Sequence, residues 1–111
     1  MKLIIAIVQD EDSNRLVNQL MNEGLGVTKL ATTGGFLRAG NTTLLIGVDD
    51  EKISAVMKII EDVCKSRKQL TAAPSTMGSM GGMPGAASYP VEVTVGGATV
   101  FVLSVDQFIK L

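Results

Sequence analysis

A glycine- and threonine-rich stretch, ATTGGFLRAGNTT at residues 31–43, contains the residue types that could bind a nucleotide. Its segment from Gly35 to Thr42 fits the phosphate-binding pattern G-x-x-x-x-G-K-T, except that Asn41 occupies the lysine position. A phosphate-binding loop needs that lysine, and it needs a helix directly afterwards whose N-terminal amides complete the cradle. Asn41 carries no charge and residues 42–48 predict a strand, so this sequence does not predict a phosphate-binding loop.

The same stretch carries the groups that a purine site requires. Phe36 offers an aromatic plane on which a base can stack, and the glycines allow the backbone to approach a ligand closely. Asn41 can both donate and accept hydrogen bonds on an adenine edge. The alternative is a glycine-rich turn between two strands, but such a turn needs neither an aromatic residue nor Arg38 at its tip.

The composition excludes several kinds of catalysis. The chain has no histidine and one cysteine, Cys64, so it cannot build a Ser-His-Asp triad, a histidine acid-base pair or a cysteine-histidine metal site. Two acidic clusters, at residues 10–12 and 49–51, each lie where a predicted strand meets a predicted helix, the position at which helix starts favour acids. A carboxylate-dependent nucleotide hydrolase stays as the enzymatic alternative. We expect no catalytic residues, no metal site and no cofactor.

Length and charge suggest one small domain spanning residues 1–111. The chain has 10 basic and 11 acidic residues and a net charge of −1, which argues against nonspecific DNA binding. Its single cysteine cannot form an internal disulfide, and its apolar runs are too short to span a membrane. These features predict a cytoplasmic protein.

Apolar periodicity predicts a strand-helix-strand unit that occurs twice. Residues 2–8 and 42–48 read as apolar strands, and residues 27–33 as a weaker strand. A first helix, capped by Asp12 or Ser13, has its apolar stripe at Leu16, Val17, Leu20 and Met21. A second has its stripe at Ile53, Val56, Met57, Ile60, Val63 and Cys64, followed by basic residues 65–68 that suit a helix C-terminus. This repetition predicts an α+β, ferredoxin-like double split β-α-β fold.

The last third of the chain predicts a long loop and an extra β-hairpin. Residues 71–90 are rich in Gly, Ala, Ser, Met and Pro without periodicity, which is typical of a loop. Residues 91–95 and 98–105 read as two strands joined by Gly96-Gly97, a hairpin signal.

Three strands, at residues 2–8, 44–48 and 99–103, are apolar on both faces. This pattern is typical of a sheet that is covered on both sides. Two amphipathic helices suffice for only one side. We therefore expect identical subunits to cover the other side.

Three segments of the chain closely resemble the PII-like cyclic di-AMP receptor family of the PstA or DarA type. They are MKLIIAIVQDEDS at the N-terminus, KLATTGGFLRAGNTT from Lys29, and YPVEVTVGGATVFVLSVDQF from Tyr89. The resemblance covers nearly the whole chain outside the Met-Gly loop. It implies a bacterial homotrimer of ferredoxin-like subunits that binds cyclic di-AMP in the clefts between neighbours and acts as a non-enzymatic second-messenger sensor. It also implies a downstream protein partner that contacts the loops.

The resemblance assigns ligand contacts to six positions of this sequence: Thr28, Gly35, Phe36, Leu37, Asn41 and Gly47. Residues 33–39 would correspond to a short T-loop, and residues 71–90 to a long B-loop. The chain departs from the family pattern at Gly26, where a basic residue is common, and at residues 109–111. A regulatory module that binds ATP or ADP, or that acts only through protein partners, is the alternative function.

Overall fold

A computed structural model describes residues 1–30, 40–72 and 90–111 of the chain. These residues form two compact units. The first contains residues 1–65 and 96–111, and the second contains residues 66–95. The predicted T-loop, residues 33–39, and most of the predicted B-loop lie outside the described residues.

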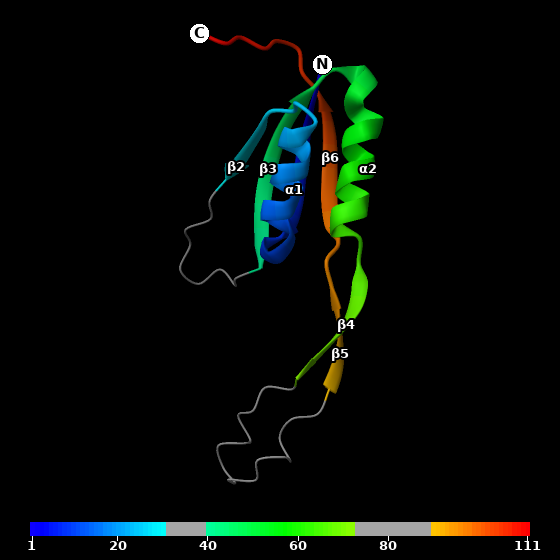
Figure 1. The fold of residues 1–111 in the computed structure, drawn as a ribbon. Helices are drawn as coiled ribbons and strands as arrows, with labels where there is room; N and C mark the ends of the chain where they lie inside the picture. Colours follow the sequence, from blue (N-terminus) through cyan, green and yellow to red (C-terminus); the bar gives the residue numbers. More distant parts are fainter. Residues whose placement is uncertain (31–39, 73–89) are drawn as a thin grey trace. The chain divides into compact units, whose positions relative to one another are not determined.

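The first unit is an α+β fold with a four-stranded antiparallel sheet (Figure 1). Its elements follow in the order β1 (Lys2–Gln9), α1 (Asp10–Asn22), β2 (Val27–Leu30), β3 (Asn41–Val48), α2 (Ile53–Cys64) and β6 (Ala98–Ser104). A short 3-10 helix, η1 (Asp50–Lys52), leads into α2. The strands lie in the order β2-β3-β1-β6, so β3 is inserted between β1 and β2. This order agrees with the predicted ferredoxin-like fold.

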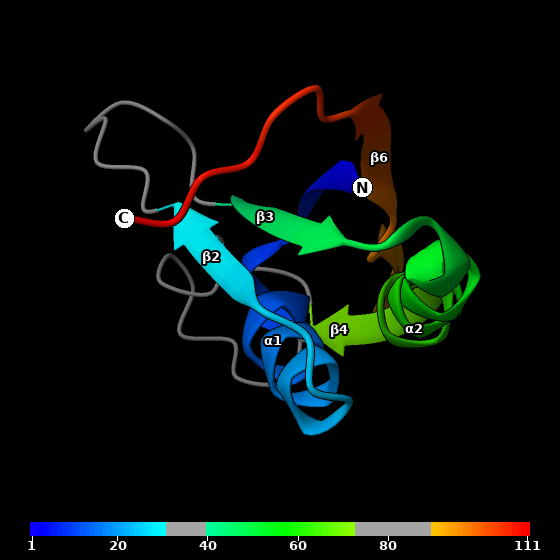
Figure 2. The same cartoon turned by 90° about the horizontal axis from the view of Figure 1, so that it is seen from above.

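Both helices pack on the same face of this sheet, as the view along the strands shows (Figure 2). From Ile4 in β1 and from Thr42 in β3 onward, the residues at even positions are buried on the helix side, and Ile4 and Ile46 are fully buried. Because side chains alternate across a strand, residues at odd positions point to the other face. The apolar core therefore lies between the sheet and the helices; it consists of Ile4, Ala6, Val8, Leu16, Leu20, Leu25, Leu44, Ile46, Val48, Val56, Ile60, Val63 and Cys64.

We call the opposite side of the sheet the helix-free face. The strand registers place the following side chains on it: Leu3, Ile5, Ile7 and Gln9 of β1; Thr28 and Leu30 of β2; Asn41, Thr43, Leu45 and the glycine Gly47 of β3; and Thr99, Phe101 and Leu103 of β6. Within the single chain Phe101 is 50% exposed and Leu103 is 45% exposed. The sequence prediction of apolar residues on both faces of the sheet is thus confirmed.

Both predicted helices are present, but α1 differs from its prediction at both ends. Helix α1 begins at Asp10, with Gln9 as its N-cap, so the prediction of a cap at Asp12 or Ser13 was wrong. The side chains of Asp12 and Ser13 are buried, and Ser13 Oγ donates to the carbonyl oxygen of Asp10 over 2.9 Å. Met21, predicted as part of the stripe, is 59% exposed. Both acidic clusters do lie at helix starts, as predicted.

The second unit contains a two-stranded antiparallel ribbon of β4 (Arg67–Ala72) and β5 (Pro90–Val95). Strand β4 was not predicted: residues 67–68 were assigned to the helix C-terminus and residues 71–72 to the start of the loop. The side chains of Lys68 and Glu92 form an ion pair across the ribbon over 3.7 Å.

The predicted hairpin between β5 and β6 was also wrong, because β5 pairs with β4 and β6 pairs with β1. Gly96 and Gly97 do have the positive φ values of a hairpin turn, 84° and 94°. They use this conformation to lead the chain from one sheet to the other. The Gly-Gly signal therefore predicted the local backbone correctly and the strand pairing incorrectly.

Candidate functional site

The near-match to a phosphate-binding loop ends in a strand. Asn41 is the first residue of β3, which continues to Val48. No helix N-terminus follows the motif, so the backbone amides that hold phosphates in such loops are not available here. The predicted strand directly after the motif is confirmed.

Three of the six predicted site residues lie in the described part of the chain, and all three belong to the helix-free face. Thr28 is in β2, opposite Leu45, while Asn41 and Gly47 are in β3; all three are exposed. The other three, Gly35, Phe36 and Leu37, lie outside the described residues.

Asn41 lines a hollow of about 250 Å³ at one end of the sheet. The hollow is bounded by Ile7, Gln9, Asn41, Gly96, Gly97, Ala98 and Thr99. Side-chain amides and a hydroxyl group supply donors and acceptors, whereas the glycines expose their backbone. These groups suit an uncharged heterocycle with hydrogen-bonding edges, such as a purine base.

Hydrogen bonds hold the backbone around this hollow. The amide N–H of Asp10 donates to the carbonyl oxygen of Gly40 over 2.7 Å, and the hydroxyl group of Thr42 donates to the Asp10 carboxylate. Asn41, between Gly40 and Thr42, is therefore anchored on both sides to the junction of β1 and α1. Its position is fixed although its side chain is exposed.

Gly47 lines a second hollow, of about 230 Å³, at the other end of β3. Its wall contains Met1, Gly24, Leu25, Gly26, Gly47, Val48, Asp49 and Lys52. A Cβ at Gly26 would meet nothing within 4 Å, and one at Gly47 would meet the Met1 side chain at 3.4 Å. The two glycines leave the backbone accessible, and the wall carries one acidic and one basic side chain, Asp49 and Lys52.

The two hollows are well separated within one chain. Asn41 and Gly47 are six positions apart on one strand, which corresponds to about 20 Å at 3.3–3.4 Å per residue. A single base cannot contact both residues of the same chain.

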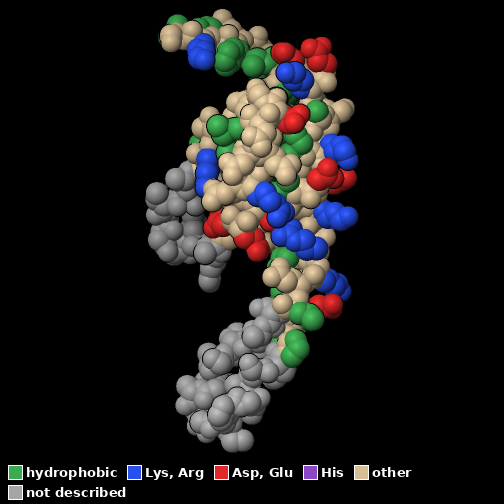
Figure 3. Space-filling view, viewed as in Figure 1, with side chains coloured by type: hydrophobic (Ala, Val, Ile, Leu, Met, Phe, Trp, Pro, Cys, Tyr) green, Lys and Arg blue, Asp and Glu red, His purple; other side chains and the backbone are tan. Residues whose placement is uncertain are grey.

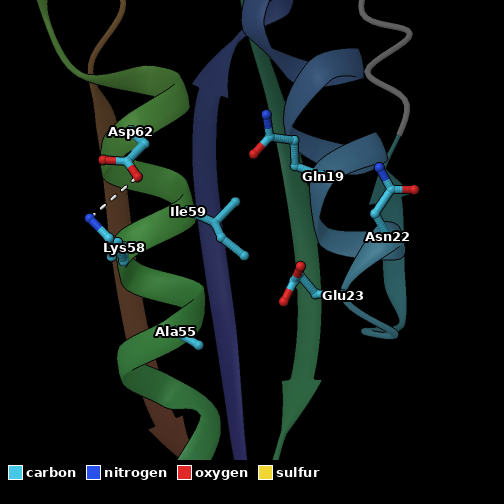
Figure 4. Close-up of a pocket in the computed structure, with 7 residues that line it drawn as sticks. All are labelled: Gln19, Asn22, Glu23, Ala55, Lys58, Ile59 and Asp62. Carbon is cyan, nitrogen blue, oxygen red and sulfur yellow. Dashed lines mark ion pairs between the residues drawn. The ribbon is translucent and has the colours of Figure 1, made fainter.

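A third hollow lies between the outer surfaces of α1 and α2, away from the predicted site (Figure 4). It holds about 410 Å³ and is lined by Gln19, Asn22, Glu23, Ala55, Lys58, Ile59 and Asp62. Lys58 and Asp62 form an ion pair over 3.5 Å along α2. None of the predicted site residues lies here. The space-filling view shows charges of both signs mixed over this helical side (Figure 3).

The described residues add two further observations. They contain no group of three or more His, Cys, Asp or Glu side chains placed to hold a metal ion. Neither described helix has the length and continuous apolar surface that a membrane span requires.

Sequence reasoning missed Gln9, Thr99 and Lys52 as lining residues of the two hollows. Gln9 directly follows the apolar run of β1 and lies opposite Asn41 in the strand register. If β1 is assumed to pair with β3, Gln9 is predicted to lie beside Asn41. No sequence pattern predicts that Thr99 or Lys52 lines a hollow. Their positions depend on the backbone conformation near Gly96 and in η1.

The fold is antiparallel α+β, with side-chain amides, a hydroxyl group and glycines around a hollow at one end of β3, and glycines around a hollow at the other end. This arrangement fits a protein that binds a small ligand. The chain belongs to the cyclic-di-AMP receptor family, which it matches over residues 1–111. It is also similar to the crystal structure of a functionally unknown protein from Pediococcus pentosaceus ATCC 25745. The sequences are 44% identical, the match covers 99% of this chain and 96% of that chain, and the TM-score is 0.75.

Proposed function

We propose that this chain is a PII-like, non-enzymatic receptor for cyclic di-AMP that binds its ligand between the subunits of a homotrimer. The proposed contacts are those assigned from the sequence: Thr28, Gly35, Phe36, Leu37, Asn41 and Gly47. Membership of a family of cyclic-di-AMP receptors supports the identity of the ligand.

One observation carries the proposed location of the site: Asn41 and Gly47 lie at opposite ends of β3 on the helix-free face, and each of them lines a hollow. Asn41 at one end supplies an amide suited to an adenine edge. Glycine backbone and Lys52 at the other end suit a phosphate or a second base. In the proposed assembly the Asn41 end of one subunit lies close to the Gly47 end of the next. A dinucleotide between the two subunits then contacts both ends.

The apolar character of the helix-free face supports the assembly. Ile5 lies at its centre, between Leu45 of β3 and Phe101 of β6 in the strand registers. At about 25 cal/mol per Å² of apolar surface removed from water, covering such a face favours association. A symmetric oligomer covers the same face of every subunit at once.

Replacing Asn41 with alanine tests the assigned adenine contact. A paired amide on a base edge contributes about 1–3 kcal/mol of discrimination, so N41A is expected to bind cyclic di-AMP about ten-fold more weakly. Its preference for cyclic di-AMP over cyclic di-GMP should shrink accordingly. Titration calorimetry of both ligands measures the two effects.

The matched control is Asn18→Ala, because Asn18 is an exposed asparagine of helix α1. N18A is expected to keep the parent affinity and the parent selectivity. Equal binding and equal selectivity in N41A and the parent would contradict the assignment of Asn41.

Replacing Gly26 with arginine is expected to strengthen binding. Gly26 lines the Gly47 hollow, its φ lies outside the left-handed region, and a side chain there meets no neighbour within 4 Å. A guanidinium group beside a phosphate forms charge-assisted hydrogen bonds, so G26R should bind cyclic di-AMP several-fold more tightly at low salt. The gain should diminish as salt is added, because salt screens exposed charges. Gly26→Gln, which has similar length and no charge, is the control; an equal gain in G26Q would contradict the electrostatic explanation.

A further inference from the structure

Gln9 occupies the position where the sheet, the Asn41 hollow and the Gly96-Gly97 connection meet. It is the last residue of β1 and lies opposite Asn41 in the strand register. Its side-chain oxygen Oε1 accepts a hydrogen bond from the amide N–H of Gly96 over 2.7 Å. Gln9, Asn41 and Gly96 line the same hollow.

This hydrogen bond replaces ordinary strand pairing. Pairing of β6 with β1 ends at Ala98 and Val8, and the next residue of β1 is Gln9. Beyond that point the amide of Gly97 donates to the carbonyl oxygen of Cys64, and the amide of Gly96 donates to the Gln9 side chain. The backbone that connects β5 to β6 is thus held at two points, one of which is a side chain in the hollow.

The side-chain amide of Gln9 can make a second contact through its nitrogen atom. A side-chain amide has an oxygen acceptor on one side and an NH₂ group with two donors on the other. Oε1 is bonded to Gly96, whereas Nε2 carries two N–H donors and donates to no other residue in the described part of the chain. Ring nitrogens of a base and oxygens of a phosphate are acceptors that these donors would suit.

We propose that Gln9 contacts the nucleotide through Nε2 while Oε1 holds the amide of Gly96, so that ligand binding is linked directly to the β5–β6 connection. The inference rests on the proposed function, because it takes the nucleotide to occupy the Asn41 hollow. A bound acceptor fixes the orientation of the side-chain amide, and this strengthens the hold of Oε1 on Gly96. Ligand occupancy then changes the stability of the connection without any movement of the sheet.

Amide hydrogen exchange at Gly96, followed by NMR on ¹⁵N-labelled protein, tests the link. In the parent, the Gly96 amide should be protected, and saturating cyclic di-AMP should slow its exchange further. Gln9→Ala should lose both effects and should bind cyclic di-AMP about two- to ten-fold more weakly, the loss of one net hydrogen bond.

Gln9→Glu separates the two functions of the side chain. It keeps an acceptor oxygen for Gly96 but has no N–H donor, so Gly96 should stay protected without ligand while the additional slowing with ligand disappears. Gln19→Ala, an exposed glutamine of α1, is the control and should behave like the parent in every measurement.

The outcomes distinguish the inference from the proposed function. A parent protein that binds cyclic di-AMP without any change at Gly96 would overturn the inference and leave the proposed function intact. The same holds if Q9E keeps the ligand-dependent slowing. A parent protein that does not bind cyclic di-AMP would overturn both.

Discussion

Replacing Ile5 with lysine is expected to convert the oligomer into a folded monomer that binds cyclic di-AMP only weakly. Ile5 lies at the centre of the helix-free face, opposite Leu45 and Phe101. In the single chain its side chain is only partly buried, so a lysine can lay its aliphatic stem along the sheet and keep its ammonium group in water. Between two subunits the same charge would be buried without a partner, at a cost of several kcal/mol per subunit.

Light scattering measures the mass of the particle, and circular dichroism shows whether the fold is kept. The matched control is Asn18→Lys, which adds the same charge on helix α1 and should leave the oligomer intact. A parent protein that is already monomeric at micromolar concentration would contradict the assembly. An I5K oligomer with parent affinity for cyclic di-AMP would contradict the interface on this face.

Replacing Phe36 with alanine is expected to weaken cyclic di-AMP binding by roughly five-fold to a hundred-fold. The estimate follows from the energy of stacking a base on an aromatic side chain, about 1–3 kcal/mol. The assignment of Phe36 comes from its aromatic plane within the glycine-rich stretch and from the family resemblance. Calorimetry at constant salt concentration measures the effect.

Two further substitutions distinguish stacking from simple bulk. Phe36→Tyr keeps the aromatic plane and should stay close to the parent affinity, whereas Phe36→Leu keeps an apolar side chain without a plane and should resemble F36A. If F36A bound cyclic di-AMP as well as the parent, Phe36 would have no part in the site. If F36L retained full affinity, bulk rather than stacking would explain its contribution.

Much of the fold could be predicted from local patterns, because most elements have apolar periods that match their structure. The stripe of residues 53–64 predicted α2, and the apolar runs predicted β1 and β3. Strand β4 has one large apolar residue, Leu70, which is 67% exposed, so it carries no period to detect. It is a strand because it pairs with β5, and pairing between distant segments leaves little trace in local composition.

The common sheet face of two predicted site residues follows from sequence for a similar reason, whereas their contact with a ligand stays a prediction. Asn41 and Gly47 are both at odd positions of β3, so strand alternation alone places them on one face. The hydrogen bond between the Gly96 amide and the Gln9 side chain could not be predicted, because the two residues are 87 positions apart in the sequence. The prediction that residues 1–111 form one domain stays a prediction, as do the contacts of Gly35, Phe36 and Leu37.

Titration calorimetry of the purified protein with cyclic di-AMP, cyclic di-GMP and ATP tests the central claim most directly. A receptor whose equivalent sites lie between neighbouring subunits should bind one cyclic di-AMP per chain, and it should bind the other two ligands more weakly or not at all. Incubation with the ligand should return cyclic di-AMP chemically unchanged. Saturable binding of ATP with no binding of cyclic di-AMP would contradict the account.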